Sequence, residues 1–210
     1  MHVKLNKYLI ELRNKSNLLE RTDINGKVND SLASKQLVRT FCSMAAASLV
    51  WHLDEGFNDT FIGYASTVLS IFIGLFITAI IFSFDKFYEP TDLNVATSKV
   101  RLWDTQTYNY SKQFAYITGY NIVLCIFTLA LLLLNSLFKD KMSIELHKYA
   151  FNFNEIDFVS IRLFFQITLV ILTRFFVLYW IFKVMYNTLF VVSSMVKFMD
   201  IKIDKKNDSN

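Results

Sequence analysis

The sequence predicts an all-α, polytopic membrane protein with four transmembrane helices, both termini in the cytosol, and helical extensions on the cytosolic side. Three observations support this class. Hydrophobic residues make up 53% of the chain and charged residues 19%, whereas soluble domains carry about 25% charged residues. The apolar residues are gathered into long runs instead of recurring at helical or strand spacing. Lys and Arg are concentrated in alternate connectors between these runs.

The first 36 residues precede the apolar runs and are predicted to form a cytosolic segment. Over residues 3–20, apolar side chains recur among lysines and arginines at the spacing of a weakly amphipathic helix. Such a helix lies exposed or on a surface. The following stretch, "DINGKVND", is rich in turn-forming residues and predicts a connector. A segment of this length is too short to bury a core of its own.

A transmembrane domain is predicted over residues 37–199. The predicted spans cover residues 37–53, 61–84, 114–138 and 158–192. A hydrocarbon core of about 30 Å needs about 20 helical residues, so the first span is marginal and the next two are comfortable. The fourth run begins near Phe158 and stays apolar to about Met199, beyond what a bilayer requires. We expect it to continue as a cytosolic helix, followed by a disordered polar tail over residues 200–210.

The distribution of Lys and Arg predicts the orientation. The segment up to Arg39, the 85–113 loop and the C-terminal tail together carry 16 of these residues, and the connector at 139–157 carries three. Cytosolic loops are the ones enriched in Lys and Arg. Both termini and the 85–113 loop are therefore predicted to lie in the cytosol.

Two cations within the fourth run, Arg174 and Lys183, are candidate functional charges. If the bilayer covers about residues 166–186, Arg174 lies near its midplane, where a cation costs about 2.5–3.5 kcal/mol. Lys183 lies closer to the cytosolic end, where its stem can reach the interface. Two roles for Arg174 stay open. It is either a structural residue bound by carbonyls and amides of neighbouring helices, or it faces water or another subunit and favours anions. The candidate amide and hydroxyl partners are Asn121, Asn135 and Thr78.

Small residues at four-residue spacing occur in the first two spans and are candidates for helix packing. They are Ser43 and Ala47 in the first span and Ser70, Gly74 and Thr78 in the second. Small side chains at this spacing let helix backbones approach closely. These faces are predicted to pack against each other or against a neighbouring subunit.

The cytosolic 85–113 loop contains aromatic and basic residues typical of interfaces: Arg101, Trp103, Tyr108 and Tyr110. Two interpretations stay open. The segment is either a helical extension of the third span or a docking surface for a cytosolic partner. Acidic residues nearly balance the basic ones, so no direct nucleic-acid binding is expected.

No catalytic, cofactor or metal site is predicted. The chain contains no Gly-rich phosphate loop, no GxSxG and no HExxH. Cys42 and Cys125 fall inside apolar runs, without the spacing of a metal site. We therefore expect a protein that is not an enzyme.

The architecture resembles the small four-span proteins of bacterial anti-phage defence systems, such as the membrane subunit of Kiwa. The resemblance lies in three features: the basic helical N-terminus, the hairpin "WHLDEGFNDTFIGYASTVLSIFIGLFITAIIFSFDKF", and the charged helical loop before the third span. It implies residence in the bacterial inner membrane, homo-oligomers, contact with membrane lipid, and a cytosolic protein partner. It also implies a subunit that senses membrane disturbance or recruits that partner. The alternative is an oligomeric pore that depolarises or permeabilises the membrane.

Overall fold

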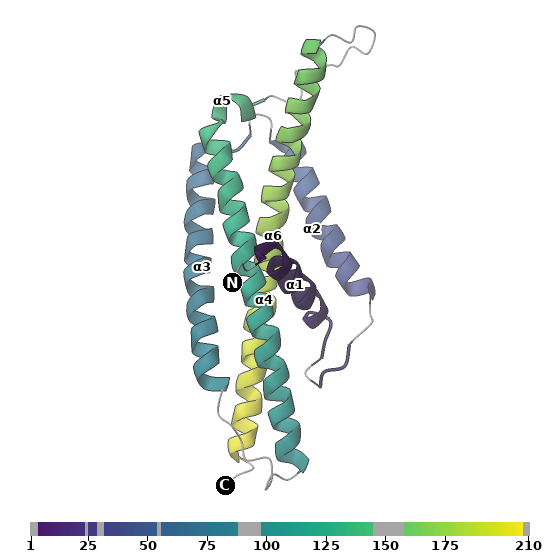
Figure 1. Ribbon diagram of the computed structural model, residues 1–210, viewed down its shortest axis with the longest axis vertical. Helices are drawn as coiled ribbons and strands as arrows, with labels where there is room; N and C mark the ends of the chain where they lie inside the picture. Colours follow the sequence, from purple (N-terminus) through teal and green to yellow (C-terminus); the bar gives the residue numbers. More distant parts are fainter. Residues whose placement is uncertain are drawn as a thin grey trace. The chain divides into compact units, whose positions relative to one another are not determined.

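The computed structural model describes residues 4–23, 25–28, 32–53, 56–87, 98–144 and 158–207, and every regular element within these ranges is helical (Figure 1). The predicted all-α class is therefore confirmed. The helices are α1 (Leu5–Leu19), α2 (Leu32–His52), α3 (Asp59–Phe87), α4 (Ser98–Leu137), α5 (Lys139–Met142) and α6 (Phe158–Asn207).

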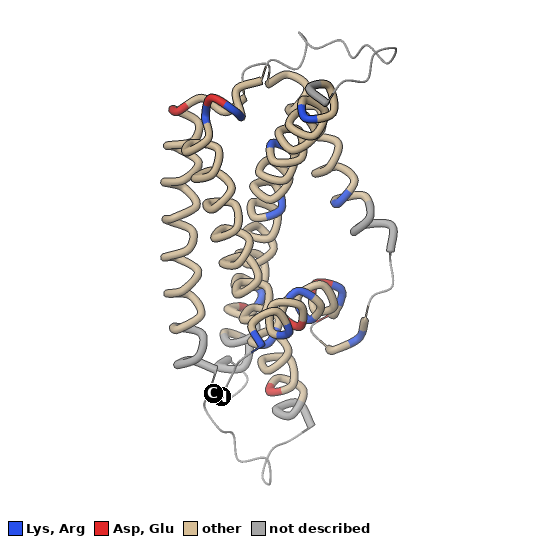
Figure 2. Tube along the Cα trace, turned by 45° about the horizontal axis from the view of Figure 1, so that its top comes forward, with Lys and Arg blue, Asp and Glu red and all other residues tan. Residues whose placement is uncertain are grey.

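Among the described residues, three helices are long and apolar enough to cross a membrane. They are Asp59–Ile81 in α3, Leu102–Leu137 in α4 and Ser160–Asp200 in α6. α2, which contains the first predicted span, is not one of them. Figure 2 shows a long uncharged stretch in α3, whereas α1 carries Lys, Arg and acidic residues over much of its length. A membrane protein follows from length and composition.

Several helix ends agree with the predicted boundaries. α6 begins at Phe158, as expected. α4 is one helix that carries Trp103 into the third span, so the predicted helical extension is confirmed. The expectation of a disordered tail from residue 200 is wrong as far as Asn207, where α6 ends. Extending an existing helix costs much less than nucleating a new one, and lysines favour helix, so the polar tail continues α6.

The chain forms two compact units, each assembled from separate stretches of sequence. Unit 1 consists of Met1–Leu32, Ile73–Val123 and Met185–Asn210; unit 2 consists of Ala33–Phe72 and Leu124–Val184. Each of the helices α3, α4 and α6 is divided, with one part in unit 1 and the other part in unit 2. Within unit 1, Phe114, Ile117 and Val191 form a buried cluster.

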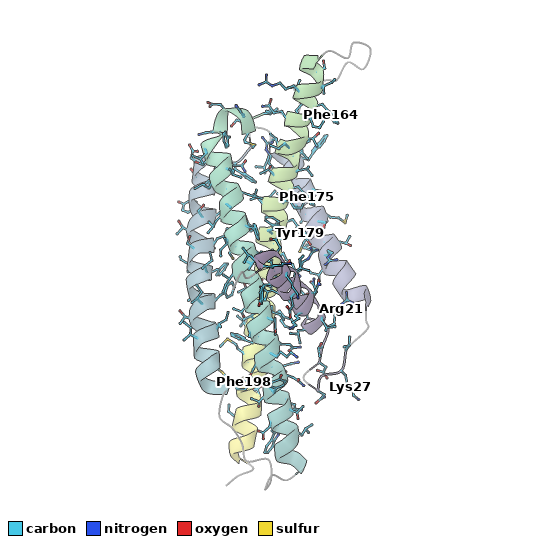
Figure 3. All side chains as sticks on the ribbon, viewed as in Figure 1. Arg21, Lys27, Phe164, Phe175, Tyr179 and Phe198 are labelled. Carbon is cyan, nitrogen blue, oxygen red and sulfur yellow. The ribbon has the colours of Figure 1, made fainter. Side chains whose placement is uncertain are left out.

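Unit 2 has its own apolar cluster and a set of aromatic contacts. Ile167 and Val170 of α6 pack with Ile144, which follows α5. Phe127 of α4 lies 6.2 Å from Trp180 of α6, centroid to centroid. The rings of Phe175 and Tyr179, labelled in Figure 3, are stacked one turn apart on α6 at 6.0 Å.

A seven-residue repeat organises the buried face of α6. Val170, Val177, Val184 and Val191 recur at this spacing, and none is more than 5% exposed. Apolar residues repeated every seven positions keep one face of a helix against its neighbours. On α4 the same spacing is occupied by polar residues, since Asn121, Thr128 and Asn135 are all buried. Polar side chains are thus built into the packed face of a helix that is otherwise apolar.

Candidate functional site

In unit 2, the guanidinium of Arg174 is bound by main-chain carbonyls. Nη1 donates to the carbonyl oxygen of Leu53 at 2.7 Å. Nη2 donates to the carbonyl oxygens of Met142 at 2.9 Å and Ile144 at 3.2 Å. The Arg174 residue is only 1% exposed. One cation therefore joins α6 to the ends of two other segments through hydrogen bonds that a charged donor strengthens.

These contacts place the Arg174 guanidinium at the ends of other helices. Leu53 directly follows α2, Met142 ends α5, and Ile144 lies just beyond it. Connectors with main-chain carbonyls outside a regular helix do not occur facing lipid within the hydrocarbon. The guanidinium therefore lies at the level of these connectors, and its expected position near the bilayer midplane stays a prediction. Of the two open roles, the geometry is that of the structural one.

A glycine turn makes room for the guanidinium. Gly56 has φ +89°, a backbone conformation that L side chains rarely adopt, and an added Cβ would lie 2.9 Å from Nη2 of Arg174. Glycine is the residue that adopts this conformation without steric cost. The α2–α3 connector thus approaches Arg174 with its bare backbone. The sequence did not predict this role, although Gly56 lies within the turn-like stretch "DEGFND".

Two further contacts in unit 2 hold the same connectors. Lys139 of α5 pairs with Asp59, the first residue of α3, at 2.6 Å. Gln166 of α6 donates to the carbonyl oxygen of Lys141 at 3.1 Å. Both contacts are exposed, so each contributes little stability on its own. Together with Arg174 they fix the first turns after α2 and α4.

The other polar residues predicted as partners of Arg174 are used elsewhere. Asn121 of α4 accepts a hydrogen bond from Asn187 of α6 at 2.7 Å, within unit 1. Asn135 donates to the carbonyl of Leu131, and Thr78 to that of Gly74, each in its own helix. Lys183, the second candidate charge, is half-buried in unit 2.

The Asn121–Asn187 pair contains two polar atoms that make no hydrogen bond within the described part of the chain. Both residues are 0% exposed, and the Nδ2 of Asn121 and the Oδ1 of Asn187 have no partner in the described part of the chain. An amide pair of this kind favours one alignment of two apolar helices, because any shift leaves more polar atoms unpaired. Its contribution is to helix register within unit 1.

In unit 1, a hydrogen-bonded clasp holds α1 and its following turn on α4. The side-chain amide of Gln113 donates to the carbonyl oxygens of Leu19, at 2.8 Å, and Thr22. Lys15 donates to the hydroxyl of Tyr116 at 3.2 Å. Lys15 also pairs with Glu11, and this hydrogen bond raises the pKa of the Lys15 amine and lowers the pKa of the Glu11 carboxyl. The sequence analysis did not identify the clasp, since a lone Gln113 carries no recognisable signal.

The predicted docking residues of the 85–113 loop have different environments. Tyr108 is 64% exposed, with the Lys112 amine 5.9 Å from its ring centroid. Trp103 is half-buried, and the side chain of Arg101 lies outside the described residues. The prediction of Tyr110 as a docking residue is wrong, because this side chain is only 4% exposed and belongs to the interior of unit 1. It follows the same helical stripe as Phe114 and Ile117, which explains its burial.

The small residues predicted for helix packing do not pack against each other. Ser70, Gly74 and Thr78 of α3 and Ala47 of α2 are exposed, and Ser43 is half-buried. The packed face of α2 is instead formed by Cys42, Ala46 and Val50. The second possibility, contact with a neighbouring subunit, stays a prediction.

No group of His, Cys, Asp and Glu within the described ranges is arranged to hold a metal ion. No family model matches the chain, and no curated protein or solved structure shows significant similarity to it.

Replacing Arg174 tests the importance of its hydrogen bonds to the three main-chain carbonyls. Arg174→Leu leaves three carbonyl oxygens without their donor, and Arg174→Lys replaces a planar fork by a single ammonium group. We expect both variants to insert into the membrane but to lose roughly 2–4 kcal/mol of stability, because hydrogen bonds to charged groups contribute about 1.5–3 kcal/mol each and are not additive. Thermal unfolding in detergent measures this loss. The control is Arg162→Leu, an exposed arginine in the same helix. Equal unfolding temperatures for Arg174→Leu and wild type would show that these hydrogen bonds do not stabilise the protein.

Replacing Gly56 tests the turn independently. Gly56→Ala is expected to destabilise the protein by at least about 1–2 kcal/mol, the cost of a left-handed conformation for an L residue, and to displace the guanidinium. Gly63→Ala is the matched control, because an added Cβ on Gly63 in α3 meets nothing within 4 Å. That change should be neutral or stabilising by up to about 1 kcal/mol. Thermal unfolding in one detergent compares the two, and similar effects at both positions would contradict the close approach.

Proposed function

We propose that this chain is the inner-membrane subunit of a bacterial anti-phage defence complex, in which it senses membrane disturbance and recruits a cytosolic effector. The defence context rests on the resemblance of its architecture to such subunits. The recruiting role rests on the helical platform described next.

The observation that carries the proposal is the length of the helices outside the bilayer. α4 has 40 residues and α6 has 50, which correspond to about 60 and 75 Å at 1.5 Å per residue, against about 30 Å of hydrocarbon. The surplus of α4 is its polar N-terminal part, and α1 is clasped to α4 directly beyond this part, through Gln113 and the contact of Lys15 with Tyr116. A membrane anchor alone needs no such structure. We name α1 and the Ser98–Lys112 part of α4 the platform.

The place of α2 supports the proposed four spans with both ends on one side. Its 21 residues span about 32 Å, enough for the hydrocarbon core. Arg174 binds both the carbonyl of Leu53, just after α2, and the carbonyl of Met142, at the end of α5. The α2–α3 and α4–α6 connectors therefore meet at one end of unit 2. From there α2 packs along unit 2 through Ala46 and exposes Phe41 and Met44, a face suited to lipid. The basic residues then favour a cytosolic position for the opposite end.

The pore alternative has less support from the described residues. Arg174 is buried against carbonyls, which is not the arrangement of a charge that lines a water-filled path. The hydroxyls of Thr67 and Thr78 on the exposed face of α3 bond to carbonyls of their own helix. A pore would therefore have to form from surfaces brought together by several copies.

Reporter fusions test the number of spans. With four spans, a reporter after Asn210 and one before Met1 should both be active only in the cytosol. With three spans, in which α2 lies outside the hydrocarbon, the two reporters should give opposite results. A pair of enzymes that are active on opposite sides of the inner membrane measures this at each terminus. Opposite locations would overturn the four-span arrangement.

Crosslinking and phage challenge test the recruiting role. A photoreactive residue in place of Tyr108 should capture a cytosolic protein in the native cells, whereas one in place of Tyr64, which is 72% exposed on α3, should not. Tyr108→Ala should reduce protection against phage without changing the amount of protein in the membrane. If protection is unchanged, and expression of this chain alone depolarises cells, the pore alternative replaces the proposal.

A further inference from the structure

The apolar stripe of α1 extends beyond the part that α4 covers. Leu5, Leu12 and Leu19 recur every seven residues on one face, and Tyr8 lies on the same face. Leu19 is 9% exposed, and the Cδ1 of Leu12 lies 3.6 Å from a Cβ built on Gly119 of α4. Leu5, in contrast, is 64% exposed, and Tyr8 is 54% exposed. The first two turns of α1 thus present the continuation of a packing face that no other described part of the chain covers.

The contacts within unit 1 show in which direction this uncovered end lies. Along α1 toward its N-terminus, Leu19 is bound by Gln113, Lys15 by Tyr116, and Leu12 lies against Gly119. α1 therefore advances along α4 toward the apolar run. Lys112 is the last charged residue of α4, and the rest of that helix to Leu137 has no charge. In this direction Leu5 and Tyr8 lie toward the apolar run of α4, and not toward its polar N-terminal part.

Two cations flank the uncovered apolar residues. Lys4 and Lys7 are exposed, and neither amine has a hydrogen bond or salt bridge to another described residue. The first acid of α1, Glu11, is already paired with Lys15 at 2.6 Å. The end of α1 therefore combines exposed apolar side chains with positive charge, which is the composition of an interfacial anchor.

We propose that residues Lys4–Ile10 form a lipid-binding anchor that places Leu5 and Tyr8 at the acyl boundary and binds acidic phospholipid headgroups through Lys4 and Lys7. The exposed leucine and tyrosine enter the interface because no described part of the chain covers them and a bilayer offers them an apolar phase. The lysines select acidic lipid by charge, and each contributes an attraction that falls off within a Debye length of the surface. This binding site is independent of the proposed role in defence.

A quenching experiment on the full chain in lipid nanodiscs tests the anchor. A bimane probe is attached to Leu5→Cys and, as the control, to Leu18→Cys, which is 53% exposed on the opposite face of α1. The two native cysteines, Cys42 and Cys125, are buried, so a maleimide reacts selectively with the surface thiol. Nanodiscs of phosphatidylcholine are compared with nanodiscs that also contain phosphatidylglycerol. A nitroxide on the lipid chain quenches a probe in the interface, and iodide quenches a probe in water.

With phosphatidylglycerol present, the probe at residue 5 should be quenched by the nitroxide lipid and shielded from iodide, and the probe at residue 18 should show the reverse. Lys4→Gln with Lys7→Gln should lower the ratio of inserted to exposed probe roughly 25-fold, about fivefold for each lysine. Arg13→Gln with Arg21→Gln removes the same charge from the exposed surface of the clasped part and should leave the ratio nearly unchanged.

Three results would overturn the anchor. Equal iodide quenching at residues 5 and 18 would place the stripe in water. Shielding from iodide without nitroxide quenching would mean that a protein, or a second copy of this chain, covers the stripe. Equal insertion in both lipid compositions would show that acidic headgroups are not the ligand. None of these results depends on the presence of a cytosolic partner, so the test is separate from that of the proposed function.

Discussion

The rest of the structure depends on the need to satisfy main-chain carbonyls where helices end near lipid. Hydrocarbon offers no hydrogen bonds, and an unpaired carbonyl there costs several kcal/mol. In unit 2 a single guanidinium binds the carbonyls of Leu53, Met142 and Ile144. Five N–H donors in a planar fork suit this task better than any other side chain. The buried charge is tolerated because the C-terminal ends of α2 and α5 carry partial negative charge.

Buried polar residues in the two units do different physical work. Arg174 joins connectors to a helix, whereas Asn121 and Asn187 align two helices side by side, and Gln113 attaches α1 and its turn to α4. The apolar contacts around them, such as the valine repeat of α6, are compatible with several alignments. Polar pairs select one of these alignments, because the alternatives leave donors or acceptors unpaired in a medium without water.

The sequence predicted the helices better than their contacts. Long apolar runs and charged connectors are strong signals, so the start of α6 at Phe158 and the helix over residues 98–113 were predictable. The carbonyl partners of Arg174 were not, since they lie 121, 32 and 30 positions away in the chain. The clasp of Gln113 was equally hidden, because it joins residues 91 and 94 positions apart. Tyr110 was misplaced because aromatic residues are typical of interfaces and of cores alike.

These assignments restrict where recognition takes place. The polar side chains followed through the apolar helices, from Arg174 to the Asn121–Asn187 pair and Thr78, bond within this chain. Each replacement is therefore expected to act through stability. The surfaces for which binding is proposed are the uncovered start of α1, with Lys4 and Lys7, and the polar part of α4, with Tyr108. Both lie on unit 1, and a lipid contact at the first would hold the second close to the membrane surface, where an effector would meet it.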